Sequence, residues 1–131
     1  MNARPTPPTA SKKSAAIEFL QLVAAGKVRE AYDKHVGASF RHHNPFFRGD
    51  AASLRNAMEE NAAKNPSKTL EVQRALEDGD LVAVHSRVRQ KPDDLGASVI
   101  HLFRFEGERV VELWDVGMAV PAESPNANGM F

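Results

Sequence analysis

The chain has 131 residues and carries 17 basic and 17 acidic side chains, so its formal net charge is +0. A chain of that length can bury the core of one domain, whereas the balanced charge speaks against a nucleic-acid partner, which normally meets a basic surface. The lack of cysteine excludes disulfides, and without a secretory signal or an apolar run of roughly 18 residues we expect a cytoplasmic protein with no membrane partner.

The first predicted elements are a tail and a helix. Residues 1–13 are rich in proline and poor in apolar side chains, which indicates a flexible tail. From residue 14 onward the pattern changes, because Ile17, Leu20 and Val23 recur at helical spacing. We therefore expect the domain to begin at residue 14 with a helix.

A second short helix is predicted from Val28, and Gly37 is expected to end it. The stretch FRHHNPFFRGD, residues 40–50, follows as a predicted loop. Asp50 is then placed to cap a helix over residues 51–65, whose apolar side chains form a stripe.

Everything after this helix has the pattern of β-strands. The predicted strands are residues 68–77, 81–90, 98–106 and 110–120. Asp78-Gly79 is a strong hairpin signal between the first two. Helices followed by a meandering antiparallel sheet predict an α+β domain over residues 14–121, and residues 122–131 are expected to be a C-terminal tail, docked or free.

The strand over residues 81–90 is apolar on both faces, with Val82 and Val84 on one face and Leu81 and Ala83 on the other. A strand of this kind is buried on both sides. One layer of helices can cover only one face, so we expect a homodimer that associates through the sheet.

The last two strands can pair in two registers. One register pairs residues whose numbers sum to 216, which makes a single apolar surface and sets His101 beside Asp115. The other sums to 215, follows from a two-residue turn at Gly107-Glu108, and sets His101 against Trp114. Burial usually decides register, so the first is favoured, with a longer turn or a bulge.

An imidazole and a carboxylate on an apolar surface have two interpretations. They can form a structural hydrogen bond, or they can exchange protons, because an apolar pocket favours the neutral carboxyl group. Of the other histidines, His85 either joins the same cavity or is buried and structural. No spacing among His42, His43, His85 and His101 is typical of zinc ligands, so no metal is expected.

Several motifs together resemble a known family. The segments that carry the resemblance are HHNPFFRG, GDLVAVHSRV, IHLFRFEGERVVELWDV and NANGMF. Through them the chain resembles the SnoaL-like polyketide cyclase and predicted ester-cyclase group, within the nuclear transport factor 2-like superfamily. The resemblance covers nearly the whole chain from residue 14. It implies a cone-shaped α+β fold, in which a curved antiparallel sheet wraps around helices and encloses a pocket.

The resemblance also implies roles for individual residues. Asp115 corresponds to the family's general acid/base in an aldol-type ring closure, and His101 to the histidine that supports it. His43, Asn44 and His85 match motif positions near the pocket. The residues expected to bind or enclose the ligand are His43, Asn44, His85, Phe47, Phe103 and Trp114, with His43 and Asn44 facing inward and His42 facing solvent.

The resulting hypothesis is an enzyme that needs no cofactor and transfers protons next to the carbonyl of a hydrophobic small molecule, in a cyclisation or an isomerisation. Hydrolysis or dehydration in the same pocket is the alternative within the enzyme class. The rival class is a non-catalytic module of the same fold that binds a small ligand or serves as a dimeric scaffold. A protein-partner adaptor would instead show a filled cavity.

Overall fold

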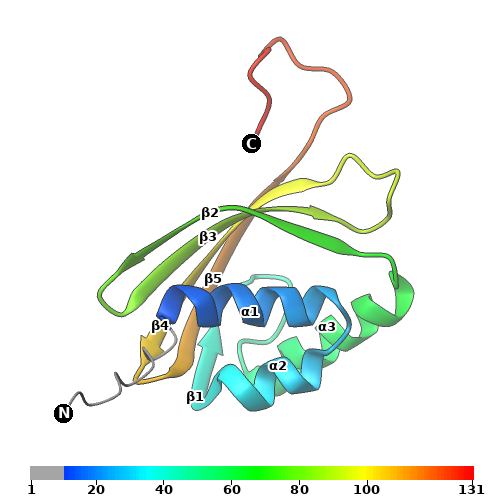
Figure 1. The fold of residues 1–131 in the computed structure, drawn as a ribbon. Coiled ribbons are helices and arrows are strands. Elements are labelled where there is room, and N and C mark those ends of the chain that lie inside the picture. Colours follow the sequence, from blue (N-terminus) through cyan, green and yellow to red (C-terminus); the bar gives the residue numbers. More distant parts are fainter. Residues whose placement is uncertain (1–10) are drawn as a thin grey trace, which may run out of the picture.

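The computed structural model describes residues 11–131, in which three helices cover one face of a curved five-stranded sheet (Figure 1). The helices are α1 (Lys12–Ala24), α2 (Val28–His35) and α3 (Ala51–Lys64), and the strands are β1 (Val36–His42), β2 (Thr69–Asp78), β3 (Leu81–Arg89), β4 (Ala97–Glu106) and β5 (Arg109–Ala119). The predicted α+β class and the curved sheet are confirmed, and the sheet is open at both edges. Within the described residues no helix is both long and apolar enough to cross a membrane.

The N-terminal helix begins earlier than predicted. Most of the expected tail, residues 1–10, lies outside the described residues. Ser11 accepts a hydrogen bond from the backbone N–H of Ser14 and caps α1. Lys12 and Lys13 are therefore helical, and the prediction of a tail is wrong for these two residues.

Strand β1 differs from the prediction of a loop after Gly37. Residues 36–42 pair in parallel with β5 at the sheet edge, so the strand order is β1-β5-β4-β3-β2 and the sheet is not purely antiparallel. The loop begins only after His42. Parallel pairing joins segments about 70 residues apart, as in Arg41 opposite Glu112, and such long-range pairing leaves little trace in the local sequence.

The four later strands form the predicted meander, and the hairpin of β4 and β5 contains both of the predicted registers. Glu106 pairs with Arg109 next to a two-residue turn, whereas Arg104 pairs with Glu112 beyond a bulge. The bulge adds one residue to β5 and changes the sum of paired numbers from 215 to 216. The favoured register is confirmed on the side of the bulge away from the turn, from the pair Arg104–Glu112 to the pair Ala97–Ala119. The expected pairing of Phe105 with Val111 is wrong, because Phe105 lies opposite Val110.

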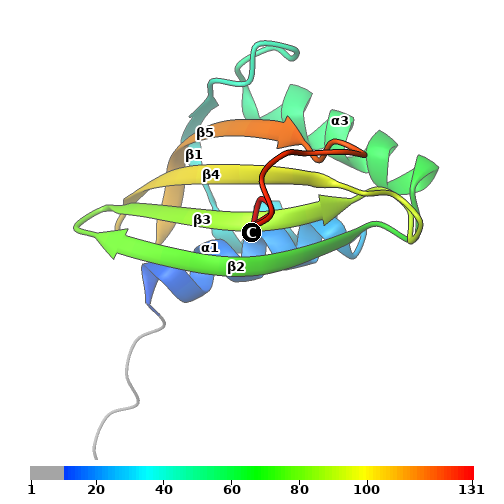
Figure 2. The same ribbon diagram turned by 90° about the horizontal axis from the view of Figure 1, so that it is seen from above.

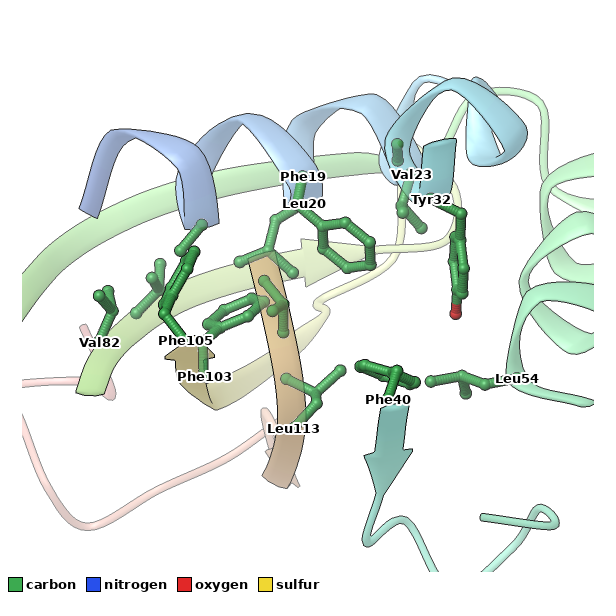
Figure 3. Packing of buried hydrophobic residues seen from close by; sticks show 14 of the residues in the cluster. Phe19, Leu20, Val23, Tyr32, Phe40, Leu54, Val82, Phe103, Phe105 and Leu113 are labelled. Carbon is green, nitrogen blue, oxygen red and sulfur yellow. The ribbon is translucent and has the colours of Figure 1, made fainter. Parts of the chain in front are cut away.

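The core lies between the helices and the inner face of the sheet, which is the face that they cover (Figure 3). Phe19 of α1 packs edge-on against Phe103 of β4, with ring centroids 5.9 Å apart. Tyr32 of α2 and Phe40 of β1 extend the aromatic cluster toward Leu54 of α3. These rings fix the helices to the sheet by burying large apolar areas.

The outer face of the sheet carries no helix, and it bears apolar side chains as well as charged ones such as Arg104 and Glu112. Its exposed large apolar side chains are Leu76, Leu81, Ile100, Val116 and Met118. The C-terminal segment after β5 turns back over this face, and Figure 2 shows the C-terminus lying above β3. There the Phe131 ring stacks on His85, with centroids 5.9 Å apart, and lies 4.9 Å from the Arg87 guanidinium carbon.

Candidate functional site

A cavity of about 310 Å³ opens between α1, α3 and the inner face of the sheet. Its walls are mainly apolar and include Leu20, Val23, Leu54, Met58, Leu70 and Val99. Among these side chains stand a few polar groups from the sheet and the loops. Apolar walls with a small number of convergent polar groups are typical of small-ligand sites.

His101 and Asp115 lie opposite each other in the β4–β5 ladder, and both line this cavity. No hydrogen bond joins these two described side chains. The Nδ1 atom of His101 is buried without a partner among residues 11–131. Burial lowers the pKa of His101 to about 4, because desolvation of the imidazolium outweighs the attraction of Asp115. His101 is therefore neutral near pH 7 and can accept or donate a proton toward a ligand.

Asn44 supplies the hydrogen bond that Asp115 receives. Its Nδ2 donates to Asp115 Oδ2 at 3.1 Å, while its Oδ1 accepts the backbone N–H of Phe46 at 3.0 Å. The second bond fixes which way the amide points. Asn44 and Phe47 both line the cavity, so the HNP loop forms part of its wall, as expected.

The two adjacent histidines of this loop have the opposite orientations to those predicted. His42 is buried, and its Nε2 donates to the Arg48 carbonyl while its Nδ1 accepts the Asn44 N–H. His43 is half-exposed and stacks on Trp114, with centroids 4.9 Å apart and planes at 8°. The physical reason is that β1 continues to His42, so Phe40 and His42 alternate inward while Arg41 and His43 alternate outward.

Three further residues expected at the pocket lie elsewhere. His85 is on the outer face, where its Nε2 donates to Ser98 Oγ at 2.7 Å and its Nδ1 accepts from Arg74. Trp114 is on the outer face beside Ile100. Phe103 is fully buried in the core beneath His101, with ring centroids 6.3 Å apart. The structure thus brings together Asp115, His101, Asn44 and Phe47 from the expected set, and the other four do not line the cavity.

Glu112 also belongs to β5, and its side chain holds the loop from the outer face of the sheet. The Nε atoms of Arg41 and Arg104 each donate to its carboxylate at 2.9 Å, and His43 Nε2 donates at 2.6 Å. The hydrogen bonds from Arg41, His43 and Arg104 hold the pKa of Glu112 at about 2. This cluster anchors His43, and with it the neighbouring Asn44, against β5.

Three polar residues of the cavity were not predicted from the sequence, namely Lys68, Asn61 and Gln90. Lys68 Nζ donates to Asn61 Oδ1 at 2.9 Å. A signal for Lys68 was present, because alternation from Leu70 places residue 68 on the same inward face. A lysine at the end of a strand is usually solvent-exposed, so this position alone does not indicate a site.

A larger hollow of about 520 Å³ lies beside the first turn of α1 and the β4–β5 turn. Its walls include the charged side chains of Lys12, Lys34, Glu77 and Glu108, and it borders Ser11, where the described chain begins. The 310 Å³ cavity is the better candidate site because its polar groups converge within apolar walls. In the described range no three His, Asp or Glu side chains form a group that could hold a metal ion.

Comparisons with known proteins match most of the chain to one family. Residues 16–113 match the SnoaL-like domain, a match that ends two positions before Asp115. No curated protein matches the chain.

Solved structures with a similar fold include three bacterial proteins of low sequence identity. A nuclear transport factor 2-like protein of unknown function from Cytophaga hutchinsonii has a TM-score of 0.69 at 15% identity, over 86% of this chain and 95% of its own. IdmH from Streptomyces antibioticus, described as "a putative polyketide cyclase", has a TM-score of 0.68 at 16% identity, over 82% and 92%. AclR from Streptomyces galilaeus, described as "a putative hydroxylase", has a TM-score of 0.70 at 19% identity, over 82% and 88%.

Proposed function

The chain belongs to the SnoaL-like domain family, and on this premise we propose that it is an enzyme for proton transfer next to the carbonyl of a hydrophobic small molecule, in an aldol-type cyclisation or an isomerisation. The observation that carries the proposal is the Asp115 carboxylate, which faces an apolar cavity opposite His101 and is held by Asn44. The polyketide cyclase description of IdmH agrees with this reaction class.

The mechanism follows from these positions. Asp115 would remove a proton from the carbon next to the substrate carbonyl, which the carbonyl has already acidified. Asn44 orients the carboxylate through its Nδ2, so the base is held in place before the substrate arrives. His101, neutral and with a buried Nδ1 that lacks a partner, would exchange a proton with the substrate oxygen. Phe47 and the apolar walls would bind the body of the substrate.

Hydrogen–deuterium exchange tests the proposal without knowledge of the natural substrate. The protein is incubated in D₂O with 2-tetralone, a hydrophobic ketone, and loss of the α-proton signal is followed by NMR. General-base catalysis contributes about 10²–10⁴-fold, so Asp115→Asn should slow the enzymatic exchange by at least about a hundredfold. Asp93→Asn, at an exposed loop position, is the matched control and should exchange like the wild type. Exchange that is equally fast in both variants would rule out Asp115 as the base.

The non-catalytic alternative uses the same cavity to bind a ligand. One observation favours the enzyme: Asp115 has no arginine partner among the described residues, since its hydrogen bond comes from Asn44. The open cavity speaks only against the protein-partner adaptor. A protein that binds hydrophobic ketones but shows only the buffer rate of exchange would favour the alternative. The cytoplasmic location and the absence of a cofactor and of a nucleic-acid partner stay predictions.

We also propose that the protein forms a homodimer through the outer face of the sheet. Leu76 on β2 and Val116 and Met118 on β5 are each about 70% exposed there. Ile100 lies on β4, which is between these two strands in the sheet. Apolar side chains so grouped over one sheet face are typical of an association surface. A second copy would bury them, whereas the helices of the same chain cannot reach this side (Figure 1).

A further inference from the structure

Lys68 is the cation of the cavity, and no feature of the proposed proton transfer uses it. It lies in the turn between α3 and β2 and lines the cavity wall. Its one side-chain hydrogen bond goes to the neutral oxygen of Asn61, and within the described chain it has no ion-pair partner. Burial lowers the pKa of Lys68, because desolvation disfavours the charged ammonium.

Gln90 lies beside Lys68 and has an unused polar atom. Thr69 pairs with Arg89 and Leu70 with Val88, so Lys68 and Gln90 continue the same register just beyond the two strands. Alternation puts both on the inner face. The Gln90 Oε1 atom is buried without a hydrogen-bond partner among the described residues. This acceptor oxygen can take a donor of the ligand or a further N–H of Lys68, whereas the positive charge for an anion at this corner comes from the Lys68 ammonium.

The corner lies at a distance along the sheet from the acid/base pair, although the pKa of His101 is lowered by burial and also by the charge of Lys68. Along the inner face, Gln90 is followed by Val88 and Ser86 on β3, and Ser86 lies opposite Val99, two residues before His101 on β4. Val88 and Val99 both line the cavity between the two polar groups. A ligand that reaches both would have an apolar body with one polar group at each end.

We propose that Lys68 binds a carboxylate of the ligand at this corner, so that the substrate is a hydrophobic keto acid whose reacting carbonyl lies at the Asp115 end. An ammonium has three N–H donors, and the bond to Asn61 leaves two for a ligand. Taking a lone cation out of water is unfavourable, and an anionic partner with hydrogen bonds offsets that cost. The inference rests on the proposed function and names its substrate class.

A pair of probes with the same shape and different charge tests the inference. Binding of 4-phenylbutanoate and of its neutral counterpart 4-phenylbutanamide is measured by isothermal titration calorimetry near pH 7. A charge-assisted hydrogen bond in a desolvated site should make the wild type bind the carboxylate at least about tenfold more tightly than the amide. Lys68→Met keeps the apolar stem of the side chain and removes the charge, so it should abolish this preference and leave amide binding within about twofold.

Three variants complete the experiment. Lys64→Met, at an exposed position in the last turn of α3, should keep the wild-type preference. Lys68→Arg should restore part of it, because the positive charge is retained. Asp115→Asn should also keep it, so a failure of the proposed catalysis leaves carboxylate binding unchanged and the two proposals can be told apart. Equal binding of both probes by the wild type, no binding of the carboxylate, or an equal loss of both probes in Lys68→Met would overturn the inference.

Discussion

Asn44 and Asp115 are 71 positions apart in the chain and are joined by a hydrogen bond of 3.1 Å from Nδ2 to Oδ2. The bond connects the HNP loop to the end of the β4–β5 hairpin. The loop is also held on both sides of this bond. On the buried side His42 accepts the Asn44 N–H, and on the outer face of the sheet His43 donates to Glu112. The loop therefore positions the carboxylate as well as forming part of the cavity wall.

Replacing Asn44 should reduce the reaction more than it reduces ligand binding. In Asn44→Ala the carboxylate of Asp115 loses its donor and its fixed orientation, and a hydrogen bond to a charged group typically contributes about 1.5–3 kcal/mol. We expect the rate of proton exchange in 2-tetralone to fall by about tenfold or more, with little change in ketone affinity. Asn56→Ala, at an exposed position on α3, is the control. Equal losses of rate and affinity would indicate that Asn44 binds the ketone instead.

The stability of the protein should fall as the pH drops from about 6.5 to about 4. The native pKa of His101 is about 4, below the ordinary value of about 6.5 for an unfolded chain. In this window the unfolded state binds more protons, so stability is present above pH 6.5 and is lost on acidification. His101→Phe should remove this part of the pH dependence, which we expect to be about 1–3 kcal/mol.

Urea unfolding at several pH values between 4 and 7 provides the measurement, with the slope of stability against pH compared between wild type and variant. The slope is the useful quantity, because the substitution also changes core packing by a constant amount. Parallel curves for the two proteins over the whole range would contradict the prediction.

A second loss of stability is expected at lower pH, from Glu112. Its pKa is held at about 2 by hydrogen bonds from Arg41, His43 and Arg104, below the usual 4.5 of a glutamate. The stabilisation is complete above pH 4.5 and is lost as the pH falls toward 2. Glu112→Gln should therefore unfold with a weaker dependence on pH than the wild type between 4.5 and 2, as followed by circular dichroism.

Glu108→Gln is the matched control for this prediction, since Glu108 is exposed in the β4–β5 turn. It should show the wild-type dependence on pH. The two windows, 6.5 to 4 for His101 and 4.5 to 2 for Glu112, overlap only between pH 4.5 and 4, so the two contributions can be separated in one titration. A Glu112→Gln curve parallel to that of the wild type would show that the cluster does not stabilise the ionised carboxylate.

The dimer proposal predicts that a charge on the outer face will produce a monomer. Val116 is 69% exposed in the single chain, so Val116→Glu should leave the fold intact while placing a carboxylate in the interface. Light scattering at micromolar concentration should give a dimer for the wild type and a monomer for the variant. Phe46→Glu, at an exposed position in the loop between β1 and α3, should stay dimeric. A monomeric wild type would contradict the proposal.

The sequence was sufficient to place His101 opposite Asp115, because period-two alternation and the apolar surface together determine the register of a strand pair. It was also sufficient for α3, where Asp50 caps the helix as predicted. Both features depend on residues close together in the chain or in one hairpin. Local pattern is informative where the pairing is local.

The orientations of His42, His43 and His85 could not be read in the same way. Those of His42 and His43 follow from β1, whose parallel partner lies about 70 residues later. His85 sits on a strand that is apolar on both faces, so alternation gave two sets of residues without saying which set meets the helices. The helices settle it, because Val82, Val84 and Ser86 are the ones that they bury. Placement of these side chains required the tertiary structure.

The bulge in β5 limits which insertions and deletions the β4–β5 hairpin can tolerate. In a strand, odd and even positions meet different surroundings, so the count of residues between the turn and Asp115 decides which side chain enters the cavity. Removing one residue on the turn side of Glu112 would reverse that parity, turning Trp114 inward and Asp115 outward. A single deletion would thus remove Asp115 from the cavity and put Trp114 in its place. Insertions or deletions in this hairpin should be tolerated in pairs, whereas substitutions in the turn leave the parity unchanged. Among the turn residues Gly107 is constrained, because its φ of 58° disfavours other side chains.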